Sequence, residues 1–113
     1  MPASQPVDVS LLQLIATPPE YSGKLVRVIG FCHLEFEGNG LYVHREDFVH
    51  AISKNAVWLG VAEEKKGLSD QYVLVEAIFD ARDTGHMGMF AGALRDVTRI
   101  ERWPDRREFE RQR

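Results

Sequence analysis

The sequence predicts a mostly β protein, a five-stranded Greek-key barrel with a short N-terminal helix. The chain has 113 residues, a length that supports one domain with its own core. About five segments alternate apolar and polar residues with the period of a β-strand. Links of hairpin length join them, and short antiparallel strands tend to close on themselves because closure removes exposed edges. A small open sheet with a packed helix is the competing architecture.

The composition is that of a globular domain, with 44% apolar and 27% charged residues. It excludes a disordered chain and a disulfide scaffold, and no apolar run reaches the ~20 residues of a membrane span. The lone cysteine, Cys32, cannot form an intramolecular disulfide, so the fold does not require an oxidising compartment. The first residues lack the basic and apolar regions of a secretory signal, and the cytoplasm is the expected location. A chain whose signal peptide had been removed would look the same.

A short helix is predicted near the N-terminus. Asp8 or Ser10 can cap its first turn. Pro18 and Pro19 end it, because proline cannot continue a helix and biases the preceding residue to an extended backbone. The residues that form its single apolar stripe are Leu11, Leu12, Leu14 and Ile15.

The first long strand is predicted over residues 24–31. Gly30 interrupts its alternation, and a glycine inside a strand often marks a bulge. Alternation then resumes with Leu34 and Phe36 facing inward. The Gly38–Gly40 segment, with asparagine at its centre, is typical of a tight hairpin turn because Asn and Gly tolerate positive φ.

The remaining elements alternate between strands and connectors. They are a return strand at 41–43, one or two helical turns within 46–54, a strand at 56–61, a charged loop at 63–67, a long strand at 71–81, a glycine-rich turn at 83–88 and a last strand at 90–103. The last strand is expected to bend near Asp96. We therefore divide the chain into a flexible lead-in (1–9), a barrel domain (10–103) and a mobile charged tail (104–113).

The order of apolar helix, proline and glycine-broken strand over 11–31 resembles a known group. The pattern Tyr21-x-Gly23-Lys24-x-Val26-x-Val28-x-Gly30-Phe31 is similar to the opening of small bacterial OB-fold proteins described as tRNA-anticodon-binding-like. The stretches 36–42 and 85–88 also resemble uncharacterised members. The resemblance spans roughly residues 10–103 and implies an OB-like barrel. It supplies no set of catalytic residues, because such barrels host many functions.

Binding of single-stranded nucleic acid is one candidate function, because it needs aromatic platforms and a positive groove. Rings could come from Tyr42, Trp58, Tyr72 and Phe90, and positive charge from Lys24, Arg27 and Arg45. Carboxylates on the same or adjacent strands oppose phosphate, namely Glu35, Glu37, Glu46, Asp47 and Glu76. The formal charge of −3 also disfavours a polyanionic ligand.

A metal site is a second candidate, since imidazole and carboxylate groups ligate zinc. The residues that could build it are His44, Glu46, Asp47, His50 and His86. Their spacing matches no established metal motif, and surface histidines near carboxylates are usually solvated neighbours. We predict no bound metal or cofactor.

Enzyme signatures are missing from the sequence. Cys32 has no framing Cys–His or GxSxG pattern and is expected to be a small buried residue. The Gly85–Gly88 turn could expose His86 to a ligand, although it also fits an ordinary turn whose glycines supply positive φ. We therefore predict a non-catalytic binding module.

A protein partner, or a second copy of the chain, is favoured over nucleic acid. An acidic module of this size could mask a basic partner, as an immunity protein masks a toxin. Open strand edges and exposed rings are the features that would make such contacts. The residues predicted to make them are Tyr42, His44, Arg45, Trp58 and His86.

Overall fold

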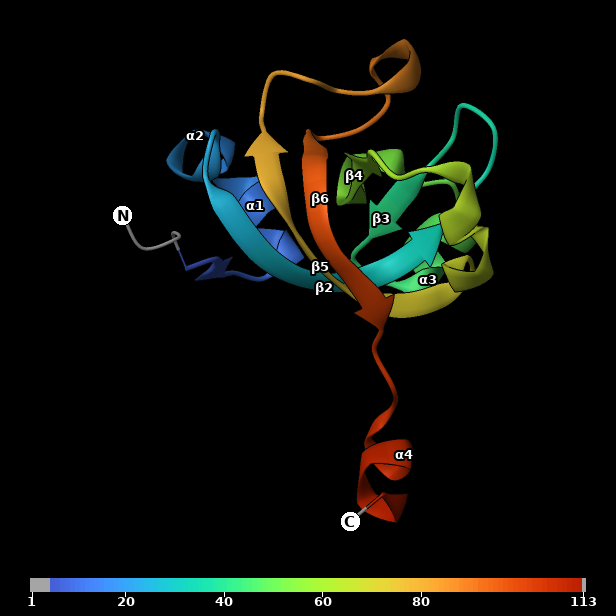
Figure 1. The fold of residues 1–113 in the computed structure, drawn as a ribbon. Helices are drawn as coiled ribbons and strands as arrows, with labels where there is room; N and C mark the ends of the chain where they lie inside the picture. Colours follow the sequence, from blue (N-terminus) through green and yellow to red (C-terminus); the bar gives the residue numbers. More distant parts are fainter. Residues whose placement is uncertain (1–4, 113) are drawn as a thin grey trace.

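A computed structural model describes residues 5–112, without the side chains of residues 63 and 64 (Figure 1). The strands are β1 (Val7–Asp8), β2 (Leu25–His33), β3 (Gly40–Tyr42), β4 (Ala56–Leu59), β5 (Gln71–Asp80) and β6 (Ala93–Arg102). The helices are α1 (Leu11–Ala16), α2 (Pro18–Tyr21), α3 (Arg45–Val49) and α4 (Arg106–Arg111), with 3₁₀ turns η1 (Ser53–Asn55), η2 (Glu63–Leu68) and η3 (His86–Gly88). In this part of the chain, every helix is too short or too polar to cross a bilayer.

Five strands close into a barrel in the order β2-β3-β4-β6-β5, with β5 returning to β2. The β4–β6 pair is parallel, and the other pairs around the barrel are antiparallel. This arrangement confirms the predicted mostly β, five-stranded OB-like barrel. An additional strand, β1, pairs parallel with β2 outside the closed ring.

The core is apolar and fills the barrel. Among its largest fully buried side chains are Phe79, Phe90, Leu14, Leu41, Leu59 and Leu94. Helix α1 covers part of this core with Leu11 and Leu14, and Ser10 begins the helix with a reciprocal capping box to Gln13. The predicted N-terminal helix and its Ser10 cap are therefore confirmed, but Leu12, predicted in the apolar stripe, is 61% exposed.

The predicted bulge at Gly30 is wrong. Strand β2 pairs with β5 without a break from Leu25 to Cys32. A Cβ at Gly30 would lie 2.8 Å from Leu41 Cγ and 2.8 Å from the Tyr42 carbonyl oxygen. Glycine is needed there because β3 approaches β2 closely.

Strand β6 carries the irregularity instead, where the sequence predicts a bend. Asp96 has φ of +51°. The register between β5 and β6 shifts between Glu76 and Ile78, opposite this residue. The expected bend near Asp96 is confirmed.

The two chain ends contain secondary structure where they are described. The predicted flexible lead-in falls partly outside the described residues, but Val7 and Asp8 form strand β1. The tail contains α4, which Asp105 caps and which stands clear of the barrel in Figure 1. The ring of Phe109 on this helix meets Trp103 edge-on at 5.4 Å between centroids.

A row of alternating charges crosses the outer face of β1, β2, β5 and β6. Arg27 binds both Asp8 and Glu76, and Glu76 Oε2 also accepts from Arg99 Nη1 at 2.9 Å. Arg99 pairs in turn with Glu101 on its own strand. The hydrogen bond from Arg27 is the main reason that the pKa of Glu76 is lowered. Both arginines of this row are therefore paired with carboxylates, and the row has three acidic groups against two basic ones.

Candidate binding site

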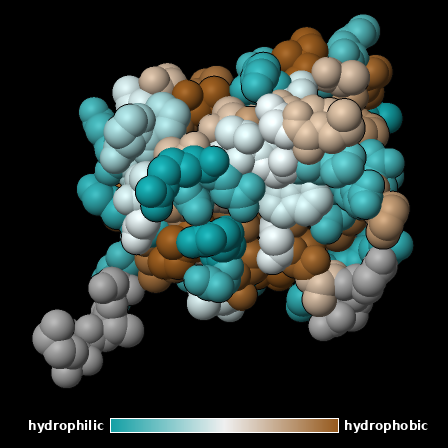
Figure 2. Space-filling view, turned by 90° about the horizontal axis from the view of Figure 1, so that it is seen from above, coloured by the Kyte–Doolittle hydropathy of each residue, from teal (hydrophilic) through white to brown (hydrophobic). Residues whose placement is uncertain are grey.

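Two loops meet at one end of the barrel, and we call residues 34–39 and 81–92 the loop rim. They join β2 to β3 and β5 to β6, and in Figure 1 they rise above the strands. His86 Nε2 lies 3.6 Å from Glu37 Oε2, which links the two loops. Lys54 Nζ donates to the Gly88 carbonyl at 3.3 Å and ties the second loop to η1. Figure 2 looks down on this end, where hydrophobic and hydrophilic side chains lie side by side.

The first loop presents Phe36 to solvent. The Glu35 N–H donates to Asn39 Oδ1 at 3.0 Å, and the Gly38 N–H donates to the Glu35 carbonyl. Glu37 adopts φ of +57°, so the chain reverses immediately after Phe36. The ring of Phe36 is 83% exposed, and its predicted inward orientation is wrong.

The second loop presents Met87 in a similar way. Gly85 has φ of +70°, and a Cβ there would lie 2.9 Å from Phe90 Cδ2 and 3.0 Å from Trp58 Cβ. The loop can therefore lie flat on these two rings only with glycine at this position. Met87 has φ of +56°, a conformation uncommon for side chains other than Asn or Asp, and is 81% exposed.

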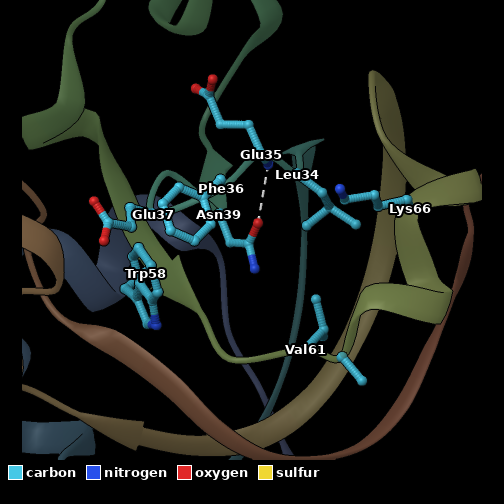
Figure 3. A pocket seen from close by; sticks show the side chains of 9 residues that line it. Leu34, Glu35, Phe36, Glu37, Asn39, Trp58, Val61 and Lys66 are labelled. Carbon is cyan, nitrogen blue, oxygen red and sulfur yellow. Dashed lines mark hydrogen bonds between the residues drawn. The ribbon is translucent and has the colours of Figure 1, made fainter.

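A pocket of about 240 Å³ lies beside the first loop (Figure 3). Leu34, Trp58 and Val61 supply apolar walls, while Glu35, Glu37, Asn39 and Lys66 supply its polar groups. Trp58 is held in place by Phe90, whose ring meets it edge-on at 5.8 Å. Ligand pockets commonly exceed about 300 Å³, so this one suits a single side chain better than a metabolite.

The predicted contact residues do not all lie together. Trp58 and His86 lie at the loop rim, as described above. Tyr42 is buried at 7% exposure between the rings of Phe48 and Phe90, and this burial raises the pKa of its phenol. It supports the rim from below rather than forming part of the surface.

His44 and Arg45 begin α3, away from the pocket at the loop rim. His44 is the N-cap residue of this helix, and its N–H donates to Asp47 Oδ2. The main-chain N–H of Arg45 donates to the Tyr72 hydroxyl at 3.2 Å. Arg45 lines a separate, open groove whose walls include Phe48 and Tyr72.

Sequence reasoning missed the partners of His33 in that groove. Its Nδ1 lies 2.6 Å from Asp70 Oδ1 and its Nε2 lies 3.4 Å from Glu35 Oε1. Its ring stacks on Phe48 at 4.0 Å between centroids. Asp70 follows His33 by 37 residues, so no local spacing could have signalled the pair. Only the pairing of the end of β2 with the start of β5 brings them together.

The alternative metal site does not form. Glu46 pairs with His50 on α3, whereas His86 pairs with Glu37 on the loop rim. Among the side chains that the structure describes (residues 5–112 without 63 and 64), no group of three histidine, cysteine or acidic residues could hold a metal ion. The predicted ligands His44, Glu46, His50 and His86 therefore serve separate local contacts.

Cys32 is fully buried, as predicted, and is expected to be unreactive in the folded protein. Burial, with a smaller effect from Asp70, raises its pKa to about 12. Because the thiolate is the nucleophile, labelling by a disulfide reagent at pH 8 should be roughly 1,000-fold slower than in unfolded chain. Absorbance of the released thiol, measured with and without denaturant, tests this. Equal rates in both states would contradict the buried position.

Comparison with known proteins supports the fold. A solved structure with similar architecture is that of a DUF3299 family protein from Pseudomonas aeruginosa PAO1. It is 12% identical, with a TM-score of 0.60, and the match covers 90% of this chain and 99% of that one. At this identity the likeness shows a shared small β-barrel and no activity. No protein-family model and no curated protein matches the sequence.

Proposed function

We propose that this protein is a non-catalytic binding module that recognises a protein partner through the loop rim. One observation carries the proposal. Phe36 and Met87 are 83% and 81% exposed on neighbouring loops that Glu37 and His86 join. Large apolar side chains held in water on fastened loops are typical of interaction surfaces, because their burial by a partner releases ordered water.

The charge of the loop rim defines the partner's chemistry. Glu35 and Glu37 are exposed beside Phe36 and line the adjacent pocket. Phosphates approaching this surface would meet two carboxylates beside one lysine, Lys66, and this acidic excess in the pocket lining argues against nucleic acid. A basic protein that places an apolar side chain beside Trp58 and a lysine or arginine beside these glutamates fits better. An immunity-like role, in which the module masks a basic surface, is consistent with this chemistry.

We also propose kinship with the tRNA-anticodon-binding-like OB-fold proteins. The barrel's strand order and the parallel β4–β6 pair are consistent with that group. In OB folds, ligands commonly bind across the second and third barrel strands and the loops that correspond to the loop rim. The proposed kinship supports a site at the loop rim, while the carboxylates argue for protein over single-stranded nucleic acid.

A capture experiment with two matched double variants tests the proposal. Phe36→Ser combined with Met87→Ser removes the exposed apolar groups of the loop rim. Leu12→Ser combined with Val49→Ser removes groups that are 61% and 55% exposed on α1 and α3. Proteins retained by the wild type are identified, and their affinities are measured with purified components. We expect a basic partner whose Kd rises at least 100-fold with the rim variant and changes little with the control.

Two results would overturn the proposal. One is a partner that binds the rim variant as tightly as the wild type. The other is saturable, low-salt binding of a labelled single-stranded oligonucleotide at about micromolar Kd, lost in the rim variant. That second result would assign the loop rim to nucleic acid.

A further inference from the structure

Strand β6 has one edge that is open over most of its length. It pairs with β5 from Ala93 to Arg102. On its other side, β4 pairs with it only at Ala93 and Leu94. Beyond Leu94 the two strands part, and no described strand covers that edge of β6. An uncovered edge carries main-chain donors and acceptors that another strand can bind.

The ladder with β5 shows which groups point outward. The N–H of Trp103 donates to the Tyr72 carbonyl at 2.8 Å. The N–H and C=O groups of every second residue in a strand point to the same side. Glu101 and Arg99 therefore direct their main-chain groups toward β5, as Trp103 does. Ile100 and Arg102 therefore direct theirs to the open edge.

A shallow groove beside this edge can take a side chain of an added strand. A groove of about 210 Å³ runs between the segment 60–65 and residues 97–100 of β6. Val61, Val97 and Ile100 give it apolar walls. Helix α4 leads away from the barrel beyond the end of β6 in Figure 1.

We propose that two copies of this chain associate by antiparallel pairing of their open β6 edges, centred on Ile100. In this register Ile100 lies opposite Ile100 of the second copy, and Thr98 lies opposite Arg102. The outward main-chain groups of Ile100 and Arg102 then meet partners that also face outward. This surface is separate from the loop rim, so the test of the dimer is independent of the test of the proposed function.

Charge complementarity indicates that the added strand is β6 of a second copy, and it also determines the register of the two strands. With Ile100 at the centre, each Arg99 lies directly opposite a Glu101 of the second copy. Both side chains project from the outer face, where they are 44% and 51% exposed. A shift of two residues one way would set Arg99 against Arg99, and a shift the other way would set Glu101 against Glu101. Like charges directly opposite each other are destabilising, so the central register is preferred.

Charge reversal provides the test. Arg99→Glu and Glu101→Arg each place like charges in both cross-strand pairs of a dimer. An equimolar mixture of the two variants restores opposite charges in both pairs. Glu20→Arg, on exposed α2, is the control because it changes net charge as Glu101→Arg does. Sedimentation equilibrium from about 10 μM to about 1 mM reports the mass, and thermal unfolding confirms that each variant is folded.

We expect a wild-type dimer that is weakened by high salt. Each single reversal should raise its Kd at least about tenfold, the mixture should recover the wild-type Kd, and Glu20→Arg should leave it unchanged. The chain combining both reversals should also dimerise, which serves as a second test if Arg99→Glu alone folds poorly beside Glu76. A single-chain mass for the wild type at every concentration would overturn the proposal. So would reversals that leave the Kd unchanged, or a mixture no more associated than its components.

Discussion

Replacing Phe79 with alanine is expected to lower the free energy of unfolding by about 3–5 kcal/mol. The Phe79 side chain is fully buried in β5, and its ring lies so close to Gly92 that a Cβ there would be 2.7 Å from Cε1. Removing the ring loses its transfer free energy and leaves a cavity between β5 and the start of β6. Domains of this size are commonly stable by only about 5–15 kcal/mol, so the variant should be partly unfolded at moderate temperature.

Urea denaturation followed by circular dichroism measures this change. Phe36→Ala is the matched control, because the same atoms are removed from a ring that is 83% exposed. It should change the free energy of unfolding by less than about 0.5 kcal/mol. Equal losses for the two variants would contradict the placement of Phe79 in the core and of Phe36 in solvent.

The second large effect is expected for Gly85→Ala. This substitution imposes a left-handed backbone on alanine and places its Cβ within 3.0 Å of Phe90 and Trp58. We expect a loss of about 2–4 kcal/mol, from backbone strain and overpacking together. The loop should also move away from Trp58, which is observable as a change in tryptophan fluorescence.

Gly88→Ala is the comparison in which a positive φ is kept and the clash is absent. Gly88 has φ of +66°, similar to that of Gly85, but a Cβ there would meet only Thr84 Oγ1 at 3.6 Å. It should therefore show the backbone penalty of about 1 kcal/mol without the clash or the fluorescence change. A loss as large as that of Gly85→Ala would show that contact with the rings contributes nothing.

Alternation along the strands was enough to predict the barrel. Residues 71–81 read as a strand because apolar residues recur at every second position, and β5 occupies 71–80. The bend at Asp96 was also predictable from the sequence. The reason for glycine at position 30 could not be predicted, because it is the close approach of Leu41 on another strand rather than a property of the neighbouring sequence.

The site was harder to predict than the fold. Phe36 continues the alternation of β2 in the sequence, yet β2 ends at His33 and the Leu34 N–H donates to the Ser69 hydroxyl instead of a strand partner. The departure of the chain from β2 before Phe36 is thus accompanied by a contact 35 residues away, which local alternation cannot reveal. Trp58 and His86 were predicted as contact residues because an exposed ring can pack against a partner and a histidine in a glycine-flanked turn can face a ligand. To predict the burial of Tyr42 from the sequence, one would have to know that α3 packs Phe48 against its ring.

The way in which the loop rim is attached to the barrel affects how the binding specificity of this protein can evolve. Its tips are fastened to one another by a histidine and a carboxylate. The contact of Phe90 with Trp58, the hydrogen bond from Lys54 to Gly88 and main-chain hydrogen bonds to β4 connect them to the barrel. Specificity can consequently drift at Phe36 and Met87 while the scaffold stays intact, which makes the tips suitable for grafting a new recognition sequence.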